Sequence, residues 1–316
     1  MGNSHESEGH RIFEMVARAI IGKQNVIIRA LLAILARGHI LIEDIPGVGK
    51  TTLALAFSKA LSLDYNRMQF TPDVLPSDVT GFTVFNRETG HMDYKPGTVM
   101  CNLFLADELN RATSRTQSAL LEAMEEGQVT VDGVPHRIPQ PFIVIATQNP
   151  VGAAGTQLLP DSQLDRFMVR LSLGYPEHDD EVKLIKQKQG TNLLDRVEQV
   201  IKRSDLEVMR REVDTVYIDP SLLNYIVALV GETRRHRLVL QGASPRASIA
   251  TMGMAKALAY IQGRDFVLPK DIAQIFIDTV AHRLIPHPEA LSDGGSVDEI
   301  LSGILNSVRA PHINKR

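Results

Sequence analysis

Residues 44–51 form a glycine-rich loop whose residue types could bind the phosphates of a nucleotide. The loop fits the pattern GxxxxGK[ST] except that Asp44 stands at the first glycine position. The glycines would let backbone N–H groups converge on phosphate, Lys50 would reach the β- and γ-phosphates, and Thr51 could ligate Mg²⁺. The residues expected to hold the phosphate chain are Pro46, Gly47, Val48, Gly49, Lys50, Thr51 and Thr52.

Two adjacent carboxylates could supply the chemistry that the loop alone lacks. Asp107 and Glu108 follow an apolar run at residues 103–106, so a buried strand is expected to end in both acids. At the carboxyl end of a parallel strand, Asp107 could hold Mg²⁺ together with Thr51, and Glu108 could polarise an attacking water. The pair therefore predicts hydrolysis of the bound nucleotide.

An amide side chain is expected at the same edge of the sheet. Residues 142–146 form another apolar run, which leads into Thr-Gln-Asn-Pro with the asparagine at position 149. An Asn-Pro pair by itself is a common turn. Because this pair follows a further strand, Asn149 is predicted to position the water or to contact the γ-phosphate.

The elements that must position these residues indicate an α/β architecture. The buried strands of a mostly parallel sheet are predicted from five short apolar runs, at residues 39–42, 67–70, 103–106, 142–146 and 167–171. Residues 116–125 have helical periodicity. Between the segments 128–131 and 134–138, Asp132-Gly133 is the residue pair favoured in a tight turn, so an inserted β-hairpin is expected there.

Strand-like patterns nearly vanish after Pro176, which indicates a second domain made of helices. Apolar residues recur at helical spacing in five segments, at 181–189, 206–212, 220–233, 244–261 and 270–281. Breaker residues favour a boundary between about positions 174 and 194. We divide the chain into a loose N-terminal tail at 1–10, a nucleotide-binding core at 11–185 and a helical domain at 186–316.

The composition excludes several other classes of protein. The 316 residues are 44% hydrophobic and 22% charged, a balance typical of soluble globular domains. The net charge of −3 gives no overall attraction to nucleic acid or anionic lipid. The sole cysteine, Cys101, cannot form an intramolecular disulfide, and no apolar run approaches the ~20 residues that span a bilayer. These features predict a cytoplasmic protein without membrane insertion.

Several segments, in a fixed order, carry a resemblance to a known family. They are residues 38–51, 105–112 with 116–126, 146–150, 159–167 and 242–247. Together they are similar to the motifs of the AAA+ ATPases and, within these, of the MoxR group, in which Asp44 is a familiar variant of the loop. The resemblance covers most of the chain. It implies a P-loop αβα core with an inserted hairpin, followed by an all-α lid domain.

The resemblance implies roles for single residues. Lys50 and Thr51 resemble the Walker A ligands of ATP and Mg²⁺. Asp107 and Glu108 resemble the Walker B pair, and Asn149 resembles sensor 1. Separately, Ile21 and Gly22 resemble the segment that lines the adenine pocket.

The resemblance also implies roles for two arginines. Arg166 resembles the arginine finger, which in AAA+ rings reaches the nucleotide of the neighbouring subunit, and Arg246 resembles sensor 2, which reaches back from the helical lid. A surface ion pair with Asp165 is the alternative for Arg166, and a solvated helix start is the alternative for Arg246. Residues 70–96 occupy the place of the helix-2 insert, which with the hairpin typically faces a ring's pore or its client.

The implied function is that of an ATP-driven remodeller of protein clients, assembled as a homo-oligomeric, hexameric ring. MoxR-like proteins are associated with the maturation of other proteins, including metal-cofactor insertion, often beside partners with von Willebrand factor A domains. One alternative is a nucleotide-controlled binding module with slow hydrolysis. Another is a DNA-acting helicase or loader, against which the net charge and the lack of aromatic residues among basic ones both count.

Overall fold

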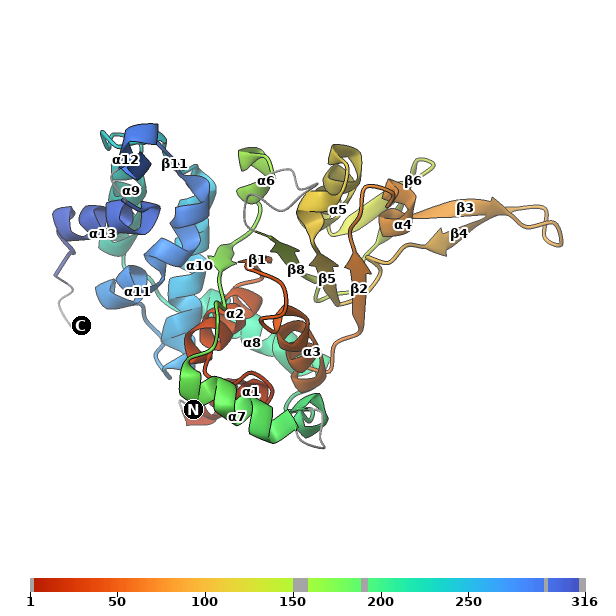
Figure 1. Cartoon of the computed structure of the whole chain (residues 1–316), viewed down its shortest axis with the longest axis horizontal. Coiled ribbons are helices and arrows are strands. Elements are labelled where there is room, and N and C mark those ends of the chain that lie inside the picture. The colour runs from red at the N-terminus through yellow and green to blue at the C-terminus, as the bar shows by residue number, and fades with distance from the viewer. Residues whose placement is uncertain (1–2, 150–158, 189–192, 293–294, 313–316) are drawn as a thin grey trace.

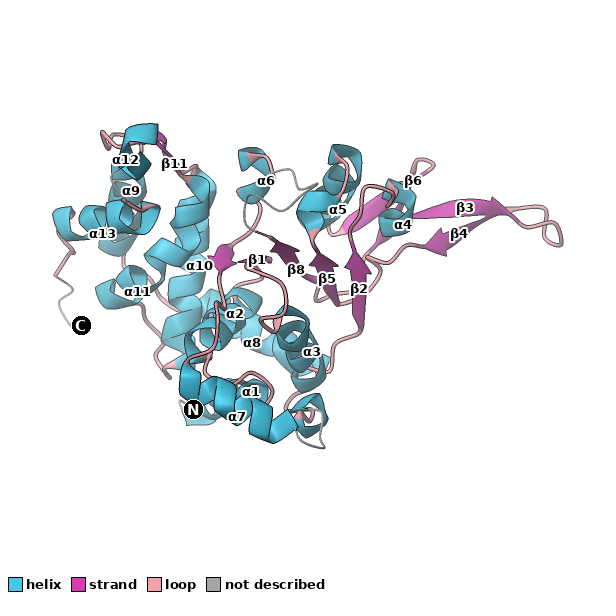
Figure 2. Ribbon diagram, in the orientation of Figure 1, coloured by secondary structure: helices cyan, strands magenta, loops and turns pink. Residues whose placement is uncertain are grey.

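A five-stranded parallel sheet forms the centre of the computed structural model, which describes residues 3–149, 159–188, 193–292 and 295–312. Figures 1 and 2 show this sheet between a helical domain and a projecting hairpin. The strands lie in the order β2 (Tyr65–Gln69), β5 (Leu103–Asp107), β8 (Ile143–Gln148), β1 (Ile40–Glu43) and β9 (Val169–Leu171). All four neighbouring pairs are parallel, which confirms the predicted fold class.

Successive side chains of a strand point to opposite faces of the sheet. Because the strands carry apolar side chains on both faces, helices cover both faces. Ile42 packs in one hydrophobic cluster and Leu41 in another. The first cluster includes side chains of α1 (Asn3–Ala17), α2 (Gln24–Leu35) and α3 (Lys50–Ala60). The second includes those of α4 (Pro76–Thr80) and α5 (Ser114–Glu126). Helix α1 begins at Asn3, although residues 1–10 were expected to be a loose tail.

The helical domain packs on the first face and shares its hydrophobic cluster. The helical elements that follow β9 are α7 (His178–Lys188), which spans the predicted domain boundary at 185/186, and η2 (Leu193–Arg196), α8 (Arg203–Thr215), α9 (Pro220–Thr233), α10 (Pro245–Ile261), α11 (Pro269–Val280), η3 (Ala281–Arg283), α12 (Pro288–Ser292) and α13 (Val297–Ser307). The sequence did not predict the small antiparallel pair between β10 (Val239–Gln241) and β11 (Ile285–Pro286).

Two antiparallel hairpins leave the core on the side away from the helical domain (Figure 1). The predicted one pairs β6 (Gln128–Val131) with β7 (Val134–Arg137), and its turn residues Asp132 and Gly133 both have positive φ. The other pairs β3 (Gly81–Phe85) with β4 (Met92–Pro96) within the insert.

The two hairpins are in contact with each other. The rings of Tyr94 and His136 stack at 3.7 Å between centroids, and Thr83 hydrogen-bonds Asp132.

Candidate nucleotide site

The phosphate loop connects β1 to the first turn of α3. Gly47 and Gly49 have φ of 87° and 103°, in the left-handed region that favours glycine. Helix α3 begins at Lys50, so the N–H groups of its first turn have no partner within the helix and face the loop. The backbone therefore has the geometry that a phosphate chain requires.

Asp44, the departure from the glycine pattern, has a structural role. Its carboxylate accepts hydrogen bonds from the backbone N–H groups of Leu173 and Gly174, the latter at 3.1 Å. Its carbonyl accepts from Nζ of Lys50 at 2.7 Å. The buried Asp44 side chain thus joins the phosphate loop to the segment that follows β9.

Lys50 links the loop to the amide predicted at the same edge. Its Nζ donates to the carbonyl of Ile45 at 3.1 Å and to Oδ1 of Asn149 at 3.5 Å. Burial lowers the pKa of Lys50, and the nearby Asp107, Asp44 and Glu108 charges oppose this shift.

The two carboxylates lie next to the lysine and are held by different partners. Oδ1 of Asp107 accepts from the hydroxyl of Thr147 at 2.6 Å, and that hydroxyl accepts from the backbone N–H of Glu108 at 2.8 Å. Glu108 has φ of 55°. Because this left-handed conformation is uncommon for a residue other than glycine, it indicates that the surroundings fix the carboxylate's direction.

Glu108 is bound at both of its oxygens. Oε1 accepts from Nδ2 of Asn149 at 3.1 Å, and Oε2 accepts from Nη1 of Arg111 at 2.8 Å. The hydrogen bond from Arg111 is the main cause that lowers the pKa of Glu108, so the group is a carboxylate at neutral pH. Lys50, Asn149 and Glu108 form one connected group at the carboxyl edge of the sheet.

The predicted adenine segment lies beside the chain that follows β9. Gly22 has φ of 75°, and any side chain there would collide with the carboxylate of Asp180. Nζ of Lys23 donates to the carbonyl of Tyr175 at 2.6 Å. The Ile21-Gly22 turn is therefore fixed against the same segment that anchors Asp44.

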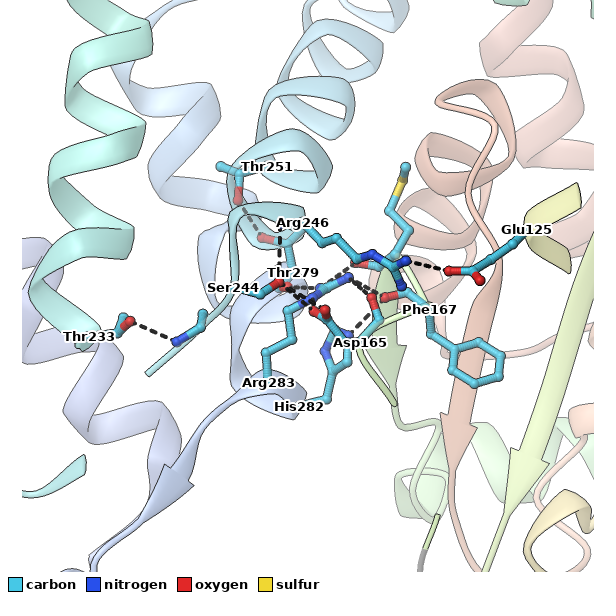
Figure 3. Close-up of polar contacts among 12 residues, drawn as sticks. Glu125, Asp165, Phe167, Thr233, Ser244, Arg246, Thr251, Thr279, His282 and Arg283 are labelled. Carbon is cyan, nitrogen blue, oxygen red and sulfur yellow. Dashed lines mark hydrogen bonds and ion pairs between the residues drawn. The ribbon is translucent and has the colours of Figure 1, made fainter. Parts of the chain in front are cut away.

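Arg166 and Arg246 do not join this group. Nη2 of Arg166 lies 3.2 Å from Oε2 of Glu125, and Nη2 of Arg246 bonds Oε1 of the same carboxylate. Figure 3 shows Arg246 directed at Glu125. Arg166 pairs with Glu125 rather than with Asp165, the partner weighed as its alternative. Arg246 stands in the first turn of α10 with its side chain 48% exposed, as the alternative of a solvated helix start describes, and it also pairs with Glu125.

These arginines lie at the amino edge of the sheet. Glu125 lies in the last turn of α5, and the carbonyl of the preceding residue, Met124, accepts a hydrogen bond from Nε2 of His39, which directly precedes β1. Arg166 likewise precedes β9. Since β1 has four residues at about 3.3 Å each, the arginines lie roughly 13 Å or more from the phosphate loop along the strands.

Comparisons with known proteins match this architecture over most of the chain. Residues 39–169 match the ATPase family associated with various cellular activities, and residues 231–304 match the AAA lid domain. The uncharacterized protein YeaC of Bacillus subtilis is 46% identical over 94% of this chain and 93% of its own. Chaperone MoxR1 of Mycobacterium tuberculosis is 35% identical over 96% of this chain and 82% of its own.

This chain belongs to the MoxR family of AAA+ ATPases. A crystal structure of a presumed ATPase from Cytophaga hutchinsonii has the same fold, with a TM-score of 0.91 and 37% identity, and the match covers 98% of this chain and 97% of that one.

The MoxR-family site offers oxygen donors suited to Mg²⁺. Asp107 and the Thr51 hydroxyl, at the start of α3, are hard ligands of the kind that bind Mg²⁺ together with phosphates and water. The Nη2 of Arg67 lies 2.7 Å from Oδ2 of Asp107, so this oxygen already accepts a cationic partner. Among the described residues, no group of three His, Cys, Asp or Glu side chains is placed to hold a metal ion by itself.

Three residues of this site were missed in the sequence: Thr147, Arg67 and Arg111. Thr147 was part of the motif that pointed to Asn149, but its contact with Asp107 follows from the pairing of β5 with β8. Arg67 and Arg111 lie in β2 and η1 (Leu109–Arg111), and only their nearness to the strand ends could have pointed to them. None of the described helices has the length and apolar character needed to cross a membrane.

Proposed function

We propose that this protein binds ATP with Mg²⁺ and hydrolyses it at the subunit interfaces of a homo-oligomeric ring, a hexamer, and that the cycle remodels protein clients. The observation that carries the proposal is the position of Arg166 and Arg246 at the edge of the sheet opposite to Lys50. A head-to-tail ring joins two different edges of the same subunit. Arginines at this edge can complete a site only in a neighbour.

Within one subunit, the chain supplies the phosphate-binding and water-activating groups. Lys50 and the first-turn N–H groups of α3 bind the phosphates. Glu108 polarises the attacking water, and Asn149, which contacts both Lys50 and Glu108, orients that water relative to the γ-phosphate. Thr51 and Asp107 would hold Mg²⁺, which would neutralise charge on the phosphates.

Arg166 and Arg246 provide the remaining positive charge from the adjacent subunit. For Arg246 this differs from the sensor 2 that reaches back from the lid, because its contact with Glu125 lies at the amino edge of the sheet. Both guanidinium groups meet one carboxylate, Glu125, at its two oxygens, so they converge closely enough to hold one phosphate group. A trans-acting arginine typically accelerates phosphoryl transfer by ~10³–10⁵-fold. Hydrolysis then depends on assembly.

The two hairpins are the proposed client surface. Apolar side chains on the projecting β3–β4 hairpin are exposed, with Phe85 and Met92 at 58% and 60% exposure, and Val134 at the turn of the other hairpin is exposed as well. Exposed apolar patches of this kind mark binding surfaces. The name of the relative Chaperone MoxR1 supports client handling. A cytoplasmic location and a partner with a von Willebrand factor A domain are part of the same proposal.

ATP turnover per subunit, measured as the protein concentration rises through the micromolar range with Mg²⁺, tests the proposal. We expect specific activity to rise with concentration, because neighbours complete the sites. Arg166→Ala should remove this rise while leaving assembly intact. Turnover that is near zero and independent of concentration, together with ATP-dependent partner binding, would instead support the nucleotide-controlled binding module.

A further inference from the structure

Asp165, the residue before Arg166, joins the core to the helical lid. Its Oδ1 accepts from Nε of Arg283 at 2.8 Å. The hydroxyl of Ser244 lies within hydrogen-bond distance of both carboxylate oxygens, at 3.0 and 2.9 Å. Figure 3 shows Ser244, Arg283 and Asp165 meeting at one point. A single carboxylate therefore contacts two lid segments and is bonded covalently to the segment of Arg166.

Ser244 brings the second arginine into the same group. It is the N-cap of α10, where its Oγ accepts from the backbone N–H of Arg246 at 3.1 Å. The start of α10, and with it the backbone of Arg246, is thus fixed relative to Asp165.

Arg283 fixes the backbone on both sides of Arg166. Its side chain is 3% exposed, and Nη2 donates to the carbonyls of Asp165 at 3.0 Å and Phe167 at 2.6 Å. Nη1 donates to the carbonyls of Met168 and Thr279. Each of the three guanidinium nitrogens therefore has an acceptor, and the fork geometry allows one orientation.

We infer that Asp165 and Arg283 are positioning residues for the two trans-acting arginines: they lock the lid to the core so that Arg166 and Arg246 reach the same phosphate. This inference rests on the proposed function. The contacts of Asp165 with the lid place both guanidinium groups on the same carboxylate, Glu125. A displacement of about 1 Å in such a group can lower a rate by about 100-fold.

The chain offers a matched control in another buried arginine–aspartate pair of the lid. Arg264 donates to both oxygens of Asp271, which is fully buried, at 2.8 and 2.7 Å. This pair lies beyond the C-terminal end of α10 and at the N-terminal end of α11, whereas Arg246 and Arg283 lie at the other ends of these helices. The 17 residues of α10 correspond to about 25 Å.

Three variants separate positioning from general stability. Asp165→Asn and Arg283→Lys should lower kcat by about 10–100-fold and leave KM for ATP nearly unchanged, since the phosphate loop lies at the other edge. Asp271→Asn should lower the melting temperature but keep kcat. Asp165→Asn carries the test by itself in case Arg283→Lys does not fold. A kcat for Asp165→Asn equal to that of Asp271→Asn would overturn the inference.

Mixed assemblies provide a readout that a structural role would not change. Each positioning variant is mixed with Glu108→Gln, which keeps its arginines in place but cannot activate water. Sites of the positioning variant that receive arginines from Glu108→Gln subunits should regain turnover, about one quarter of the wild-type value in an equal random mixture. Absence of recovery, when an Arg166→Ala mixture does recover, would reject the inference. Absence of recovery for Arg166→Ala itself, despite co-assembly, would reject the proposed function instead.

Discussion

At the scale of single residues, the motif residues were predictable from the sequence, whereas the residues that hydrogen-bond to them were not. The glycines, Lys50 and the two acids were predicted because residue type and spacing alone define a phosphate loop and a strand-end pair. Thr147 could not be predicted, because its hydroxyl reaches Asp107 only through the register that sets Leu105 opposite Ile145. A contact between strands that are distant in sequence leaves no local pattern.

Removal of the two chemical groups at the phosphate edge should have separable effects. Glu108→Gln should keep ATP binding and reduce kcat by about 10²–10⁴-fold, because the amide cannot polarise water as the carboxylate does. Lys50→Ala should weaken nucleotide binding instead. Equilibrium titration with a fluorescent nucleotide and steady-state turnover distinguish the two, and full turnover in Glu108→Gln would reject its assigned role.

Thr147 should prove as necessary as a motif residue. Thr147→Val removes the hydroxyl that donates to Asp107 and accepts from the Glu108 N–H, so we expect kcat to fall by at least tenfold and stability by about 1–3 kcal/mol. Thr147→Ser, which keeps the hydroxyl, is the matched control. Equal kcat values in the two variants would show that the hydrogen bonds are not needed.

His39 should make stability depend on pH. Its Nδ1 accepts from the backbone N–H of Val144 at 3.0 Å, and burial lowers the pKa of His39 to about 4. Between about pH 6.5 and 4 the unfolded chain binds a proton that the folded chain excludes, so the free energy of unfolding decreases as pH falls.

For this group alone the decrease from pH 7 to pH 5 is about 2 kcal/mol. His39→Gln cannot titrate, so denaturant unfolding of this variant should show a smaller difference between the two pH values. If His39→Gln and the wild type show the same difference in free energy of unfolding between pH 7 and pH 5, His39 is not the group responsible.

At the scale of elements, the buried strands were predictable and the projecting hairpin was not. Strands such as β5 and β8 are apolar on both faces, so their sequences are continuous apolar runs. In the β3–β4 hairpin, by contrast, apolar and polar side chains are both exposed, and the periodicity that marks a half-buried strand is missing. Its resemblance to the helix-2 insert predicted where it lies in the chain but not its conformation.

The exposed apolar residues of this hairpin should contribute little to the stability of the isolated protein. Phe85→Ser combined with Met92→Ser should change the free energy of unfolding by less than about 1 kcal/mol and leave ATP turnover unchanged. Val79→Ser, at a fully buried position of α4 in the same insert, should cost more than about 2 kcal/mol. If chemical denaturation shows a similar decrease in the free energy of unfolding for the double variant and for Val79→Ser, the hairpin side chains are not exposed.

At the scale of the whole molecule, the candidate site residues lie at two opposite edges of one sheet. The carboxyl edge holds Lys50, Glu108 and Asn149, and the amino edge presents Arg166 and Arg246 from the core and the lid. Under the proposed function, the carboxyl edge of one subunit and the amino edge of its neighbour together form one complete site. Sequence resemblance assigned both halves, but the distance between them follows only from the folded sheet.

The most direct test of this account mixes Arg166→Ala subunits with Glu108→Gln subunits, each nearly inactive alone, and measures ATP turnover once co-assembly is established. The account predicts recovery, to about one quarter of the wild-type rate at equal amounts, because an intact Glu108 of one subunit meets an intact Arg166 of the next. A mixture that co-assembles and stays as inactive as its components would contradict it.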